Sequence, residues 1–329
     1  ALRSLLYGAV AFSALRFAYT VRYFGREFGS GFRPDAACLA RQLSYALPFA
    51  LYVVAHIAQD NYHQYAVSGL FDAATFAIYS VGCMQIPLVE LVATTVCNVM
   101  MVGMTNAIHD GRETEVIALW NHTVRKLALA FFPLACVLLI TARDLIVMLF
   151  TDNYLASVPI FMTGLTAIFF ATVPVDGLLR VYAKTNLLLI INLFRLALIA
   201  ISIQWFVTSF GLVGAVLVTV LGLGIGKLLG LVAMSGRWES GVRNMLPWRA
   251  LSGIAALSIA AGLPALAVAY GVQTNTALRV VLVGMVYASA YMGMAIGFGL
   301  LSVQERAALS RPFELIPFIR GFRYQHKIS

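Results

Sequence analysis

Basic residues are distributed unevenly between the apolar stretches of this chain, and the pattern repeats along its length. Of the 23 Lys and Arg residues, 18 lie in or beside alternate gaps between apolar stretches. The other gaps contain only Arg143 and Arg279, while Arg3, Arg16 and Arg195 lie inside apolar stretches. Because basic residues near span ends are retained on the cytoplasmic side, the pattern predicts a chain that crosses a membrane repeatedly in a fixed orientation.

Composition excludes an ordinary soluble domain. The 329 residues are 61% hydrophobic and 11% charged, against about 25% charged in a typical soluble domain. The sequence therefore predicts an all-α polytopic membrane protein, and its net charge of +9 reflects the inner-face bias rather than nucleic-acid binding. Nine stretches approach the ~20 residues that a membrane-crossing helix needs: Leu5–Val21, Leu43–Ala66, Ala73–Thr95, Leu127–Ala142, Val158–Val181, Leu187–Phe206, Leu212–Leu228, Leu251–Tyr270 and Leu278–Leu301.

The cytoplasmic gaps and the C-terminal tail carry further signals. Nine spans that end inside must begin outside, so the C-terminus is predicted to be cytoplasmic. Phe24–Pro34 is rich in Gly and reads as a flexible link. Asp110–Lys126 has apolar residues at helical spacing, which predicts an amphipathic helix that lies on the inner surface and leads into the next span. Ser310–Lys327 mixes aromatic and basic residues, as expected of a tail held by anionic membrane lipids.

Arg195 is the basic residue that orientation does not explain. It lies eight residues after Leu187, which is roughly 12 Å into the bilayer at ~1.5 Å per residue. A lipid-facing charge at that depth is costly, so Arg195 should face the bundle or a wet cavity. It is a candidate anchor for a phosphate group or one half of a structural ion pair. Glu90, in the inner half of Ala73–Thr95 after a bend at Pro87, is a candidate partner or a carrier of a coupling proton.

Two other polar groups are candidate substrate-binding or coupling sites. Asp176 and Arg180 are four residues apart, and Lys184 follows four later. An intrahelical pair between the first two explains them without function, while a basic vestibule for a phosphate headgroup is the alternative.

His56, Asp60 and His63 fall on one helical face of the second span. We expect this face to line a water-filled cavity, where it could meet sugar hydroxyls or titrate with pH. A zinc site is the disfavoured alternative, because it would also need an open position and supporting ligands. We therefore expect no metal and no cofactor. Catalytic residues are not predicted either, since the chain has no P-loop, HExxH, GxSxG or dinucleotide-binding pattern.

The central part of the chain resembles the Wzx-type polysaccharide flippases of the multidrug/oligosaccharidyl-lipid/polysaccharide (MOP) superfamily. The resemblance extends from about Arg41 to Ala233 and depends on the order, spacing and topology of its passages. These are Phe76–Met101 followed by Arg112–Ile140, then Ala142–Leu165, then Leu178–Gly222.

This resemblance implies a MATE/MOP-like bundle whose complete form has 14 helices in two six-helix lobes plus two extra spans. The nine spans here would be the sixth to the fourteenth. Residues 1–41 would hold the last helix of a truncated first lobe and a linker, and residues 42–235 the complete second lobe. Residues 236–302 would be two additional spans, and residues 303–329 a basic cytoplasmic tail.

The implied function is transport rather than catalysis. Such proteins flip a polyprenyl-pyrophosphate-linked oligosaccharide to the outer leaflet by alternating access, in the bacterial cytoplasmic (inner) membrane, with possible H⁺ or Na⁺ coupling. Arg195 matches their cationic cavity residues in depth and chemistry. Glycan polymerases and other polysaccharide-assembly proteins are expected partners. A cation-coupled multidrug exporter and a membrane-embedded glycan polymerase or ligase are the alternatives.

Overall fold

The computed structural model of this chain consists of helices and short connections in the part that it describes, which comprises residues 2–28, 36–236, 238, 245–272 and 274–299. The chain divides into two compact units, residues 1–48 and 49–329. Helix α1 (Leu2–Phe28) belongs to the first unit, and the division falls within α2 (Ala36–Leu70). The predicted tail Ser310–Lys327 and most of the predicted link Phe24–Pro34 lie outside the described residues.

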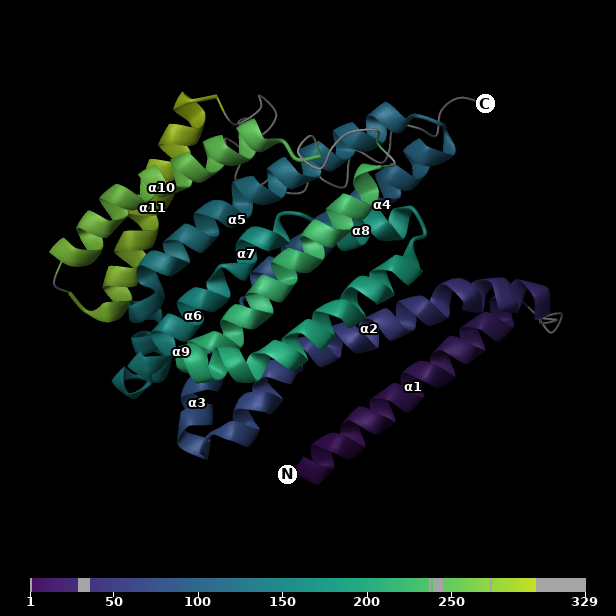
Figure 1. Cartoon of the computed structure of the whole chain (residues 1–329), viewed down its shortest axis with the longest axis horizontal. Coiled ribbons are helices and arrows are strands. Elements are labelled where there is room, and N and C mark those ends of the chain that lie inside the picture. Colours follow the sequence, from purple (N-terminus) through teal and green to yellow (C-terminus); the bar gives the residue numbers. More distant parts are fainter. Residues whose placement is uncertain (1, 29–35, 237, 239–244, 273, 300–329) are drawn as a thin grey trace. The chain divides into compact units, whose positions relative to one another are not determined.

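The second unit contains the end of α2 and all later helices (Figure 1). Seven helical runs among the described residues, α2 and six later ones, are long and apolar enough to cross a membrane. Each of the nine predicted stretches falls at least partly in a helical run, which confirms the predicted fold class. The later elements are α3 (Ala73–Gly82), α4 (Pro87–His109), α5 (Glu113–Phe150), the 3₁₀ turn η2 (Asp152–Ser157), α6 (Val158–Leu165), α7 (Ala167–Ala171), α8 (Val175–Val181), α9 (Thr185–Ser235), α10 (Trp248–Gly271) and α11 (Thr276–Gly297).

Helix α9 consists of two antiparallel arms joined at Gly211. This residue has φ +60° and ψ −145°, a conformation that glycine adopts at little steric cost. Farther along the arms, Gly222 lies against Ile199, where an added Cβ would stand 3.3 Å from that side chain. The break confirms the separation of the predicted spans Leu187–Phe206 and Leu212–Leu228.

Two of the predicted spans are divided among shorter helices, although the helices over Val158–Val181 belong to one run, Asp152–Val181, that is long and apolar enough to cross a membrane. Ala73–Thr95 is not one bent helix, because α3 ends at Gly82 and α4 begins at Pro87. Proline suits the first turn of a helix, where its missing N–H has no intrahelical partner to lose. Val158–Val181 is likewise divided into α6, α7 and α8, with Pro174 at the start of α8.

The predicted amphipathic helix over Asp110–Lys126 is present, because α5 begins at Glu113 and continues without a break into the predicted span Leu127–Ala142. Its position on a membrane surface stays a prediction. Its apolar face exists as predicted, but it packs into the protein core. Val116 and Trp120 are fully buried, and the Trp120 indole N–H donates a hydrogen bond of 2.7 Å to the Met245 carbonyl. Helical periodicity alone does not distinguish a protein core from a membrane surface.

Helices α10 and α11 form a hairpin that packs along α5 (Figure 1). The Tyr287 hydroxyl donates to the Ser258 carbonyl at 3.0 Å within the hairpin, and Tyr291 donates to the Leu129 carbonyl of α5 at 3.2 Å. Arg279 adds a two-point ion pair with Asp144 of α5, whose Nε–Oδ2 distance is 2.7 Å. One of the two basic residues in the predicted external gaps is thereby neutralised.

Candidate functional site

A cavity of about 580 Å³ lies within the second unit, between α2, α4 and the helices from α6 to α9. Its walls contain apolar side chains and several charges. Three cationic side chains face three carboxylates, so the lining is formally neutral when its histidines are uncharged. The charged and titratable lining residues are Arg180, Arg195, Lys227, Asp60, Glu90, Asp176, His56 and His63.

Seven of the eight residues predicted as substrate-binding or coupling sites line this cavity. The exception is Lys184, which lies at the junction between α8 and α9. There its backbone N–H donates a hydrogen bond of 2.9 Å to the Leu179 carbonyl. The neighbouring Ala183 has φ +53° and forms the tight turn that ends α8. Lys184 therefore belongs to the helix connection and not to the lining.

Arg195 is almost fully buried, with 6% of its surface exposed. Its Nη1 donates a hydrogen bond of 3.1 Å to Oδ1 of Asn192, one turn earlier on α9. Its Nε is buried and has no partner among the described residues. Burying a charged group with an unsatisfied donor is costly, and such a group in a membrane helix marks a candidate site for an incoming acceptor.

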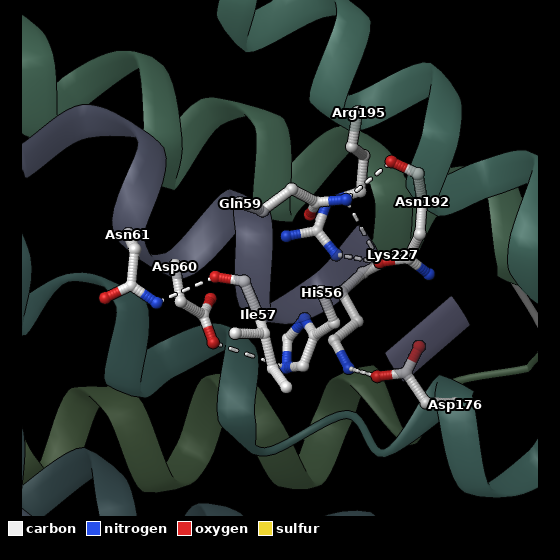
Figure 2. Close-up of polar contacts among 9 residues, drawn as sticks. All are labelled: His56, Ile57, Gln59, Asp60, Asn61, Asp176, Asn192, Arg195 and Lys227. Carbon is white, nitrogen blue, oxygen red and sulfur yellow. Dashed lines mark hydrogen bonds and ion pairs between the residues drawn. The ribbon is translucent and has the colours of Figure 1, made fainter. Parts of the chain in front are cut away.

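Asn192 connects Arg195 to α2 (Figure 2). The Asn192 amide nitrogen donates to the Leu188 carbonyl at 2.9 Å, which turns its oxygen toward Arg195. From α2, the buried Gln59 donates to the Asn192 backbone carbonyl at 2.5 Å. Sequence reasoning singled out neither Gln59 nor Asn192 as a site residue, because an amide within an apolar helix gives no signal of its own tertiary partner.

The predicted pairing of Arg195 with Glu90 is wrong. Glu90 makes no ion pair among the described residues and lies in the first turn of α4 rather than in the inner half of a longer span. Both residues nevertheless line the same cavity. The role of Glu90 in proton coupling stays a prediction.

The predicted intrahelical pair between Asp176 and Arg180 is also wrong in this structure. Asp176 pairs instead with Lys227 of α9, with Oδ2 and Nζ 2.8 Å apart (Figure 2). The Arg180 guanidinium carbon lies 4.8 Å from the centre of the Phe49 ring, within range of a cation–π contact.

Lys227 is the cavity cation that sequence reasoning missed. The charge pattern places it at the cytoplasmic end of the predicted span Leu212–Leu228, where a lysine is expected. The helix nevertheless continues through the apolar residues that follow, to Ser235. The apolar sequence after Lys227 could have indicated this longer helix, which places Lys227 two turns before its end.

His56, Asp60 and His63 line the cavity together, as their spacing predicted. His56 Nε2 lies 3.6 Å from Asp60 Oδ2, and Nδ1 of His63 shares a hydrogen bond of 2.7 Å with the Tyr79 hydroxyl. No cluster of His, Cys, Asp or Glu in the described part of the chain has a metal-binding arrangement. This face of α2 therefore offers hydrogen-bonding groups to a polar ligand.

We compared the chain with known protein families, with curated proteins and with solved structures. A family model described as "Polysaccharide biosynthesis protein" matches residues 2–159, slightly less than half of the chain. A search of curated proteins found no match. The matched segment includes α2 and α4 on one side of the cavity and ends before α8 and α9 on the other.

The fold is similar to that of the lipid II flippase MurJ in its inward closed conformation, with a TM-score of 0.57 and 13% sequence identity. The alignment covers 81% of this chain and 57% of that chain. At this identity the similarity establishes the helical architecture of a polytopic membrane protein. The chain spans little more than half of the MurJ structure.

Proposed function

We propose that this chain is part of a flippase that moves a polyprenyl-pyrophosphate-linked oligosaccharide from the cytoplasmic to the outer leaflet, by alternating access, for cell-surface polysaccharide biosynthesis. Two similarities support the proposal: the match to a polysaccharide biosynthesis family and the fold shared with a lipid II flippase. The cavity within the helices of the second unit supplies the binding site.

The observation that carries the proposal is that Arg195 is buried and has an unpaired hydrogen-bond donor. A guanidinium grips a phosphate through parallel hydrogen bonds. Arg195 is buried and lines the cavity. Among the described residues, its side chain donates one hydrogen bond, to a neutral amide, and its Nε has no partner. A charge at this depth costs about 3 kcal/mol to insert, and a diphosphate would recover part of that cost by accepting its hydrogen bonds.

The proposed function includes an orientation in the membrane and a division of the chain into parts. We place the protein in the bacterial cytoplasmic membrane with its C-terminus inside, because the basic gaps alternate in that sense. Residues 42–235 would form one six-helix lobe, and 236–302 two additional spans. Glycan polymerases and other polysaccharide-assembly proteins would act on the flipped product.

Deleting the gene in its host tests the proposal. We expect lipid-linked repeat units to accumulate on the inner leaflet, measured by their protection from an externally added glycan-modifying enzyme in intact spheroplasts. Re-expression of the gene should restore exposure of the glycan. Normal export in the deletion strain, with related transporters also removed, would contradict the proposal.

A cation-coupled multidrug exporter is the second candidate, and the three lining carboxylates favour it. Asp60, Glu90 and Asp176 could hold a cationic drug or carry coupling protons. The two candidates differ in which charges matter. An exporter should lose drug resistance when the carboxylates are neutralised, whereas a glycan flippase should lose glycan export when Arg195 is neutralised.

A further inference from the structure

The three cations of the cavity differ in what each one contacts. Arg195 contacts an amide, Lys227 contacts the carboxylate of Asp176 at 2.8 Å, and Arg180 lies over the ring of Phe49. Within the described residues, no carboxylate lies within ion-pair distance of Arg180 or Arg195. Only one of these three cations is therefore directly neutralised.

Arg195 and Lys227 are held close together by the two arms of α9. The side chain of Arg195 lies against Gly226, where an added Cβ would overlap its Cδ and stand 3.0 Å from its Nε. Lys227 is the next residue, and it lines the same cavity. A diphosphate group in this cavity would therefore meet two cations of α9 in one lining, Arg195 with an unpaired donor and Lys227 paired with Asp176 (Figure 2).

Asp176 has a second cation within reach on its own helix. Arg180 follows it by four residues on α8, the spacing at which carboxylate and guanidinium side chains meet. The Asp176 side chain is 41% exposed toward the cavity, whereas Lys227 is 15% exposed. The carboxylate is therefore the less confined member of the pair.

We propose that Lys227 is a second anion-binding residue and that Asp176 is its exchangeable counter-ion. Asp176 neutralises Lys227 while the cavity is empty and turns to Arg180 when a diphosphate group binds Lys227 and Arg195. This inference rests on the proposed function, because it takes the diphosphate of a lipid-linked glycan as the anion. The exchange keeps the carboxylate and both of its cations in favourable contacts, which avoids the large cost of leaving a buried charge unpaired.

The test is a calorimetric titration of the purified full chain in detergent with two probes. Inorganic pyrophosphate represents a free anion, and geranyl pyrophosphate represents a lipid headgroup. We expect the lipid to bind more tightly, and equal affinities would identify free pyrophosphate as the better description of the ligand and overturn the lipid assignment. Asp176→Asn should tighten binding about fivefold, the equivalent of an ion pair worth about 1 kcal/mol.

A mutant cycle isolates the exchange. Lys227→Gln should weaken binding about fivefold and remove the gain produced by Asp176→Asn in the double variant. Arg180→Gln should weaken binding in the native background and have no effect beside Asp176→Asn. Asp144→Asn, which removes a carboxylate from an ion pair outside the cavity, is the matched control and should leave affinity unchanged.

The outcomes separate this inference from the proposed function. If Arg195→Gln weakens binding but the variants of Asp176, Lys227 and Arg180 do not change it, the exchange is overturned and the Arg195 anchor stands. If neither probe binds the native chain or any variant, the anchor itself fails. Should Asp176→Asn not fold, Arg180→Gln decides alone, and an unchanged affinity overturns the exchange.

Discussion

Two ion pairs among the described residues join distant parts of the second unit, and they differ in how far their carboxylates are exposed. Arg279 and Asp144 connect α11 to α5 through two contacts, with 28% and 13% of their side chains exposed. Lys227 and Asp176 connect α9 to α8 through one contact, and the carboxylate faces the cavity. The first pair has the geometry of a structural link, while the second leaves room for a partner to be exchanged. Two ion pairs in one membrane protein can therefore have different roles, because their surroundings differ.

The largest expected effect is a loss of transport when a residue that lines the cavity is substituted. Arg195→Ala should reduce glycan export on the order of tenfold or more, because it removes a buried guanidinium that can bind a phosphate through two parallel hydrogen bonds, and Arg195→Lys should retain part of the export. Arg279→Ala is the matched control, since it removes an arginine outside the cavity. Export by protein that reaches the membrane should then be unchanged. Full export by the Arg195→Ala variant would remove the anchor role.

The next effect is on stability, from the structural pair. Arg279→Ala leaves Asp144 mostly buried without its partner, so we expect the free energy of unfolding to fall by about 2 kcal/mol. The measurement is thermal unfolding in detergent, monitored by tryptophan fluorescence. Lys227→Ala leaves the Asp176 carboxylate, which cavity water can solvate, so the free energy of unfolding should fall by less. A larger loss for Lys227→Ala would reverse the comparison between the two pairs.

A smaller effect should come from the packing that holds Arg195 in place. Gly226→Ala adds a Cβ that overlaps the Arg195 side chain, and overpacking of this kind costs about 1 to 2 kcal/mol. We expect lower stability and weaker binding of pyrophosphate by the same variant. Gly253→Ala is the control, because a Cβ there meets nothing within 4 Å. Similar behaviour of the two variants would show that Arg195 adjusts freely.

The smallest effect should come from a carboxylate that belongs to neither pair. Asp72 caps α3 and accepts hydrogen bonds from the Thr75 hydroxyl and backbone N–H, which hold its pKa below the ordinary value of 3.8. The contribution of the cap is therefore fully present above that ordinary value and is lost as the pH falls through the lower folded pKa. Hydrogen exchange at the start of α3 should increase only in strongly acidic solution. In the Asp72→Ala variant, exchange should already be fast at neutral pH.

Fold class was predictable because membrane helices leave a long apolar signal and an alternating charge pattern. The helix breaks within the predicted spans were harder to predict from the sequence. Pro87 can bend a helix or begin one, and the local sequence does not distinguish the two. In the structure α3 ends at Gly82, which packs against Ile160 so closely that an added Cβ would meet its side chain at 2.6 Å. Gly211 separates the arms of α9 as a single residue between two apolar runs, and there the sequence signal was sufficient.

The composition of the candidate site was easier to predict than its pairing. Burying charge in a membrane is costly, so Arg195, Asp60 and Asp176 stood out by type and position alone. Their partners depend on which helices lie side by side, and spacing along one helix favoured Arg180 for Asp176. Asp176 and Lys227 are 51 residues apart in the sequence, so no local pattern indicates their contact.

Two native cysteines line the cavity at different positions along one wall. Cys83 lies in the link before α4, and Cys97 lies ten residues after Pro87, about 15 Å along that helix at ~1.5 Å per residue. Cys136 is outside the lining. The chain thus carries its own pair of chemical depth markers. A membrane-impermeant thiol reagent added from one side and then from the other would show toward which compartment the cavity opens, without any introduced label.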